Sequence, residues 1–198
     1  VRDSSLLLID LGHGKDRLGG SVYSQVTQRF DSVTPDMEDP KELKKFLELI
    51  RSLSAKGAIL AYHDRSDGGL AAALCEMMFA SHVGVEIVAD ALVSKDRTLN
   101  QALFNEELGA VIQVARGRAA EVERDFEAAG MGWSLKYLGN LTQDDHLNIY
   151  LEGKCVLSED RVDLQKAWNE VSWQIARMRD NPECADSEYC LLYTSDAA

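Results

Sequence analysis

The chain contains no apolar run long enough to cross a bilayer, so the sequence predicts no membrane span. Its start also lacks the pattern of a signal peptide, because Arg2 and Asp3 stand before only a short apolar run at residues 6–9. Basic residues are outnumbered, 21 against 33 acidic, and the net charge is −12. So acidic a surface repels a phosphate backbone, which argues against a nucleic-acid partner. We expect neither a membrane nor a nucleic acid to be bound.

Cysteine is scarce, and its spacing fits no zinc site. Nothing near any of these residues marks a nucleophile, and a reduced, cytoplasmic chain is the simple expectation. The chain begins with Val1 rather than methionine, so we expect it to be a piece of a longer protein. The four cysteines are Cys75, Cys155, Cys184 and Cys190.

Hydrophobic residues make up 45% of the chain, which is enough for a sizeable core. Helical and strand patterns alternate up to about residue 130, and mostly strands follow. This order predicts a mixed α/β layer fold. The expected strands cover residues 6–11, 58–62, 84–89, 110–114, 135–138, 147–151 and 154–157. The expected helices cover residues 22–30, 40–56, 70–80, 98–104 and 118–129, with a last one from about 160.

The helix over residues 40–56 has the clearest boundaries. Asp39 is the predicted N-cap, Pro40 suits the first helical position, and Glu42 would complete a capping box. Gly57 stands where the helix should end. Ser21 is the predicted cap of the preceding helix, after two glycines that favour a turn.

The last helix should start near Asp160 and stop before Pro182. Beyond it the chain is polar and is typical of a linker. Apolar residues recur along this helix at a spacing that predicts a buried side or a domain interface. They are Val162, Trp168, Val171 and Ile175, with Trp173 and Met178 nearby.

The most informative run is HDRSDGGL at residues 63–70, between a predicted strand and a predicted helix. Two carboxylates and a hydroxyl at a strand end, followed by glycines and a helix N-terminus, suit a magnesium-bound phosphate. Taken alone, the same run is more often an ordinary N-cap and turn. The pattern by itself leaves both interpretations open.

Several runs resemble the large, single-chain form of phosphoribosylformylglycinamidine synthase. They are LAYHDRSDGGL at 60–70, LFNEELGAVIQV at 103–114, LLIDLG at 7–12, LGGS at 18–21 and RMRDNPECAD at 177–186. The resemblance runs from about residue 4 to residue 188. That enzyme has two C-terminal-type domains related to aminoimidazole ribonucleotide (AIR) synthetase, and the resemblance places the chain in the second of them. It implies the corresponding α/β fold.

The resemblance also implies an activity. The enzyme family uses ATP and glutamine to convert formylglycinamide ribonucleotide to formylglycinamidine ribonucleotide in purine biosynthesis. ATP would activate the amide oxygen as an iminophosphate, because that oxygen is otherwise a poor leaving group, and ammonia from glutamine would displace the phosphate. The glutaminase nucleophile is expected after residue 198, so no catalytic residue is assigned in this chain. The fragment alone is expected to be inactive.

Carried over position by position, the resemblance makes Asp64 a Mg²⁺ ligand and Ser66 a nucleotide contact. For the neighbouring residues, a structural role is an alternative to a role in binding. Arg65 suits either a phosphate or a structural ion pair, and Asp67 either the helix cap, which we favour, or a group behind the metal. His63 is expected to be a packed, hydrogen-bonded side chain rather than a catalyst.

Glu106 and Glu107 form a pair of neighbouring carboxylates. Neighbours on a strand point to opposite faces, so at least one of them should be structural rather than part of an acid–base pair.

We expect three segments: the AIR synthetase-like domain over residues 1–178, a linker toward the glutaminase domain over 179–188, and an atypical tail over 189–198. The partners implied are ATP, formylglycinamide ribonucleotide and the missing domains of the same enzyme. Two alternatives stay open. The chain could be an auxiliary half of the synthase that holds a nucleotide without turnover, or it could belong to another ATP-dependent enzyme of the same superfamily.

Overall fold

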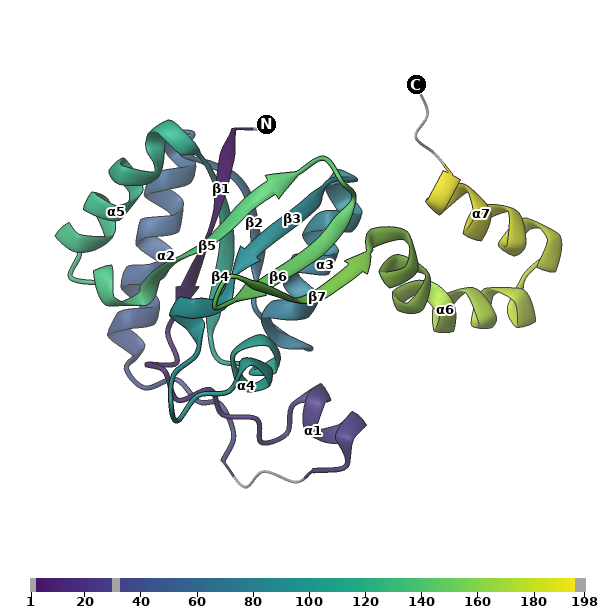
Figure 1. Cartoon of the computed structure of the whole chain (residues 1–198), viewed down its shortest axis with the longest axis horizontal. Coiled ribbons are helices and arrows are strands. Elements are labelled where there is room, and N and C mark those ends of the chain that lie inside the picture. The colour runs from purple at the N-terminus through teal and green to yellow at the C-terminus, as the bar shows by residue number, and fades with distance from the viewer. Residues whose placement is uncertain (1–2, 30–32, 195–198) are drawn as a thin grey trace.

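A computed structural model describes residues 3–29 and 33–194, and for 191–194 it describes the backbone alone. The described residues form a single seven-stranded sheet with helices on both faces (Figure 1). The strands are β1 (Ser4–Asp10), β2 (Ile59–Asp64), β3 (Gly84–Val88), β4 (Gly109–Ala115), β5 (Leu135–Thr142), β6 (His146–Leu151) and β7 (Lys154–Asp160).

All six expected helices are present, with boundaries moved by a few residues. They are α1 (Val22–Thr27), α2 (Pro40–Ala55), α3 (Gly69–Ser81), α4 (Leu99–Phe104), α5 (Ala119–Ala128) and α6 (Arg161–Arg179), and a further helix, α7 (Pro182–Thr194), follows them. The described residues also include three short 3₁₀ turns, each between a strand and a helix: η1 (Ala89–Leu92), η2 (Arg116–Arg118) and η3 (Gly132–Ser134). The predicted end of the first helix, Phe30, lies outside the described residues. Within the described residues no helix is long and apolar enough to span a membrane.

The strand order is β2-β4-β1-β5-β3-β6-β7. Neighbouring strands are antiparallel, except that β3 and β6 are parallel. Because β1 and β2 both run antiparallel to β4, they run parallel to each other and end at the same edge of the sheet. Asp10 ends β1 opposite Gly109, and Asp64 ends β2 opposite Ala110. This edge carries the run that the sequence singles out.

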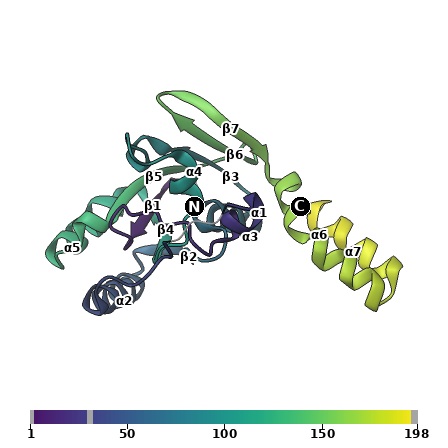
Figure 2. The same cartoon turned by 90° about the horizontal axis from the view of Figure 1, so that it is seen from below.

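Two apolar cores lie on opposite faces of the sheet. Leu6 and Leu8 of β1 pack into the core beneath α3 and α4, whereas Leu7 and Ile9 pack into the core beneath α2 and α5. Figure 2 shows these two groups of helices on either side of the sheet. A strand buried on both faces needs apolar residues at every position, which explains the run of four in β1.

The predicted helix caps largely hold. Ser21 accepts a hydrogen bond from Ser24 N, Asp39 from Lys41 N, and Asp160 from Val162 N. The capping box predicted for Glu42 is wrong, because this carboxylate lies instead 2.8 Å from His13 Nε2. The sequence pattern does not exclude such a partner, which lies 29 residues earlier in the chain.

The end of the chain differs from expectation. Residues predicted to form a linker fold into α7, which packs back on α6 with Trp173 stacked 4.4 Å from Tyr189. The predicted buried side of α6 is exposed, at 57% for Trp168 and 68% for Val171. The two helices project from the sheet (Figures 1 and 2), so the sheet does not cover this apolar stripe. Helical periodicity reveals such a stripe, but not what covers it.

Candidate functional site

The candidate site is the corner where β2 turns into α3. β2 ends at Asp64 and α3 starts at Gly69, with a turn closed by the hydrogen bond from Gly69 N to Ser66 O (2.9 Å). Gly68 and Gly69 have φ of +78° and +67°. A Cβ on Gly69 would also lie 2.6 Å from Asn105 O. Both the backbone conformation and the close approach therefore require glycine here.

Arg65 fixes the orientation of the corner by pointing into the protein. It is 4% exposed, and its Nη2 donates to Asp10 Oδ1 (2.8 Å) while its Nε donates to Glu107 O (2.6 Å). Of the two roles that the sequence left open, the structural ion pair is therefore the one that Arg65 has. With Arg65 turned inward, the flanking Asp64 and Ser66 are exposed on the outside of the corner.

The donor set at this corner limits what metal it could hold. Among the described residues no three His, Cys, Asp or Glu side chains gather closely enough to hold a metal by themselves. Magnesium commonly binds to one or two carboxylates and completes its shell with water and substrate phosphates. An exposed Asp64 therefore fits a magnesium ion that arrives with a nucleotide, and does not fit a metal held by this domain alone.

The N-terminus of α3 is occupied by a carboxylate of the chain itself. Glu106 Oε1 accepts hydrogen bonds from Gly68 N and Val22 N, both at 2.9 Å, and so joins the starts of α3 and α1. The prediction that Asp67 caps this helix is wrong: Gly68 is the N-cap, and Asp67 is exposed. A glycine cap offers no side chain, so the carboxylate comes from the loop before β4 instead.

Glu107 is itself fully buried and pairs with Arg17, a different partner from those of Glu106. Arg17 donates from Nε and Nη2 to its two carboxylate oxygens, both at 2.7 Å, and from its backbone amide at 3.0 Å. The expectation of a structural role is thus confirmed. The reason given for it was wrong, because β4 begins only at Gly109 and the two glutamates lie in the loop before it.

His63 is half-buried and hydrogen-bonded, as expected. Its Nδ1 donates to Asp64 O (2.7 Å), and its Nε2 lies 2.7 Å from Glu76 Oε2 on α3.

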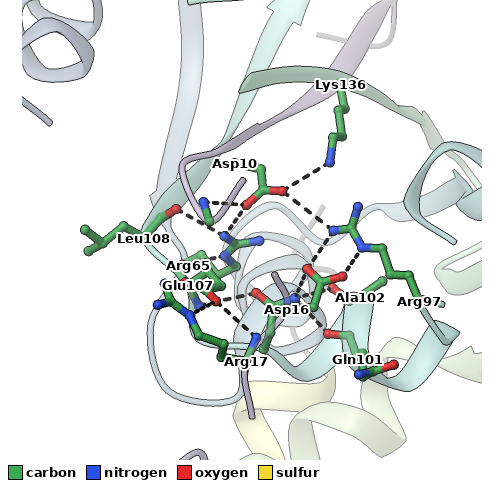
Figure 3. Close-up of polar contacts among 12 residues, drawn as sticks. Asp10, Asp16, Arg17, Arg65, Arg97, Gln101, Ala102, Glu107, Leu108 and Lys136 are labelled. Carbon is green, nitrogen blue, oxygen red and sulfur yellow. Dashed lines mark hydrogen bonds and ion pairs between the residues drawn. The ribbon is translucent and has the colours of Figure 1, made fainter. Parts of the chain in front are cut away.

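Behind the corner lies a network of charges that the sequence analysis missed (Figure 3). Asp10 is 2% exposed and faces three cations, with Arg65 Nη2 at 2.8 Å, Lys136 Nζ at 3.1 Å and Arg97 Nη2 at 3.6 Å. Arg97 also pairs with Asp16. In the local sequence, the only sign of this network is a lone aspartate, Asp10, at the end of an apolar strand.

Asp10 is held ionised by these neighbours. Burial alone would raise the pKa of its carboxyl, but the charge and hydrogen bond of Arg65, the charge of Lys136 and the Gly12 amide outweigh it, and the pKa lies well below its usual range. Asp10 and Lys136 also line a pocket of about 430 Å³. His13 and Trp133, whose rings stack with centroids 4.0 Å apart, line the same pocket.

Residues 4–152 match the family described as AIR synthase related protein, C-terminal domain. The chain belongs to this family. The matched region contains six of the seven described strands and the whole β2–α3 corner, and it ends before β7, α6 and α7. The predicted fold class is thereby confirmed.

Solved structures share the fold of this family. Phosphoribosylformylglycinamidine synthase II from Thermotoga maritima matches with a TM-score of 0.62 and 12% identity, over 81% of this chain and 25% of that one. PurL from the same organism, complexed with ATP, matches with a TM-score of 0.63 and 12% identity over the same shares. HypE from E. coli, a hydrogenase maturation protein, matches with a TM-score of 0.54 and 18% identity, over 81% and 49%. The chain spans about a quarter of the two Thermotoga chains, and the likeness is one of fold.

Proposed function

We propose that the β2–α3 corner binds ATP as its magnesium complex, and that the chain is one domain of a phosphoribosylformylglycinamidine synthase. The observation that carries the proposal is the alternation at the corner: a buried Arg65 locks the turn, while Asp64 and Ser66 on either side of it face solvent. The family match and the ATP complex of the similarly folded PurL support a nucleotide as the ligand.

Each exposed side chain has a suitable role. Asp64 would supply one carboxylate oxygen to the magnesium ion, and Ser66 would hydrogen-bond a phosphate or ribose oxygen. The metal, when bound, neutralises phosphate charge, which an acidic protein with net charge −12 does not do with its own surface. The reaction proposed for the complete enzyme is the ATP- and glutamine-dependent conversion of formylglycinamide ribonucleotide to formylglycinamidine ribonucleotide.

The experiment is a titration of the chain with ATP by calorimetry, with Mg²⁺ and then with EDTA. Asp64→Asn and Ser66→Ala are expected to weaken Mg-ATP binding at least about tenfold. Asp67→Asn is the matched control, because Asp67 is an exposed carboxylate of the same corner. Without Mg²⁺ the difference between Asp64→Asn and the native chain should vanish. Equal Mg-ATP affinity of the native chain and Asp64→Asn would refute the metal role.

One observation favours a second candidate, an auxiliary nucleotide site without turnover. Glu106 already binds the Gly68 amide at the start of α3, and Arg65 is taken up by Asp10. Two groups that often surround a reacting phosphate are thus engaged with the protein. In the complete synthase, loss of turnover with unchanged melting temperature in Asp64→Asn would favour the catalytic site. Loss of melting temperature and assembly before turnover would favour the auxiliary site.

A further inference from the structure

Glu76 of α3 joins two parts of the molecule that are distant in sequence. Its Oε2 lies 2.7 Å from His63 Nε2 on β2, and its Oε1 accepts a hydrogen bond from Trp168 Nε1 on α6 (3.1 Å). The Trp168 ring also packs against Phe79 of α3, with centroids 5.8 Å apart. One carboxylate therefore uses each of its oxygens for a different element.

At the His63 end, this series of contacts reaches the β2–α3 corner. Because His63 Nδ1 donates to the Asp64 carbonyl, the side chains of His63, Glu76 and Trp168 form a continuous path from the Asp64 backbone to α6. Arg65 holds the corner on its other side. Asp64 thus lies between two contacts that fix the corner: Arg65 bonds to the charge network, and His63 leads through Glu76 to the projecting helix α6.

The His63–Glu76 contact is bordered by open space rather than close packing. Both side chains line a mostly apolar cavity of about 280 Å³, together with Ala61, Met77 and Gln113. Close-packed neighbours would fix a side chain by themselves, but a side chain beside a cavity depends more on its hydrogen bonds. The position of His63 therefore depends on Glu76, and that of Glu76 in part on Trp168.

We propose that Glu76 is a positioning residue for the β2–α3 corner: it orients Asp64 through His63 and couples nucleotide affinity to the seating of α6 on α3. This inference rests on the proposed function of the corner. It predicts reciprocal effects, because any coupling between two sites acts equally in both directions. Displacing Trp168 weakens nucleotide binding, and bound nucleotide alters the surroundings of Trp168.

The first test is a double-mutant cycle on Mg-ATP affinity of the full chain. Trp168→Phe keeps the ring on Phe79 but removes the N–H donor, and Glu76→Ala removes both contacts. Each is expected to weaken binding about three- to tenfold, with the double variant no weaker than Glu76→Ala. Glu76→Gln can still form both hydrogen bonds and should bind nearly as the native chain does.

Trp173→Phe is the matched control. It removes an indole N–H of the same helix, but one that donates to Asp186 of α7 (2.9 Å), and it should leave affinity unchanged. Additive losses in the cycle, or an equal loss in Trp173→Phe, would overturn the coupling.

Nuclear magnetic resonance separates this inference from the proposed function. In the chain without nucleotide, Glu76→Ala should shift the Asp64 amide and the Trp168 indole resonances, and leave the Trp173 indole in place. If the native chain does not bind Mg-ATP, the proposed function fails, while these shifts would still establish the path. If Mg-ATP binds and the Asp64 amide does not respond to Glu76→Ala, the positioning role is wrong and the function stands.

Discussion

Arg65 and Asp10 form a buried ion pair, with Nη2 2.8 Å from Oδ1, that bridges the ends of β2 and β1. Strand β4 lies between these two strands, and Arg65 also donates to the carbonyl oxygens of Glu107 and Leu108 just before β4. One guanidinium thus fixes three neighbouring segments at one edge of the sheet. The outward direction of Asp64 and Ser66 is a consequence of this pair, so site geometry and stability share one cause.

Replacing Arg65 should therefore cost much more than replacing a surface arginine. Arg65→Met leaves the Asp10 carboxylate buried with less compensation and is expected to destabilise the chain by about 3–5 kcal/mol. Arg116→Met is the control, because Arg116 pairs with Asp3 on the surface, where such a pair contributes about 0–1 kcal/mol. Urea denaturation measures both. Similar losses in the two variants would show that the buried pair contributes no more to the free energy of unfolding than the surface pair.

Asp10 should also make stability depend on pH in acid. Its folded pKa lies below the unfolded value near 3.9, so the unfolded chain binds its proton first as pH falls. The stabilisation is complete above about pH 4 and is lost as pH falls through the folded pKa. Between pH 6 and pH 3, the free energy of unfolding should fall by more in the native chain than in Asp10→Asn. A parallel fall in both would refute this assignment.

Much of the fold could be predicted because its signals are local. The caps at Ser21, Asp39 and Asp160 each involve residues only a few positions apart. The ends of the strands depend on non-local pairing as well. β5 runs on to Thr142, four residues beyond its predicted end, because pairing with β1 and β3 extends it.

The candidate site could be predicted only in part. The run at residues 63–70 is contiguous and could be identified, and so could the outward carboxylate and hydroxyl. The partners of Asp10 could not, because Arg65 and Lys136 lie 55 and 126 residues away in the sequence. The role of Glu106 at the start of α3 was missed for the same reason, since Gly68 precedes it by 38 residues.

Gly139 of β5 should tolerate no side chain. A Cβ there would lie 1.8 Å from the carbonyl oxygen of Glu86 on the adjoining strand β3. Gly139→Ala must displace backbone in the middle of the sheet, at a cost of about 3 kcal/mol or more. Gly117→Ala is the control, because a Cβ there has nothing within 4 Å. Thermal denaturation should separate the two variants clearly, and an unchanged Gly139→Ala would show that the strands can move apart at little cost.

Cys75 should be the least reactive of the cysteines. Burial, and next the charge of Glu76, raise the pKa of its thiol to about 11. At pH 8 its thiolate fraction is then about a hundredfold below that of an ordinary cysteine, and only the thiolate attacks alkylating reagents. Cys155 and Cys184 are exposed and should be modified first by iodoacetamide in the folded chain, as mass spectrometry of peptides would show. In urea the protection of Cys75 should disappear, because unfolding removes both its burial and its fixed distance from Glu76. Rapid labelling of Cys75 in the folded chain would mean that α3 opens readily at this point.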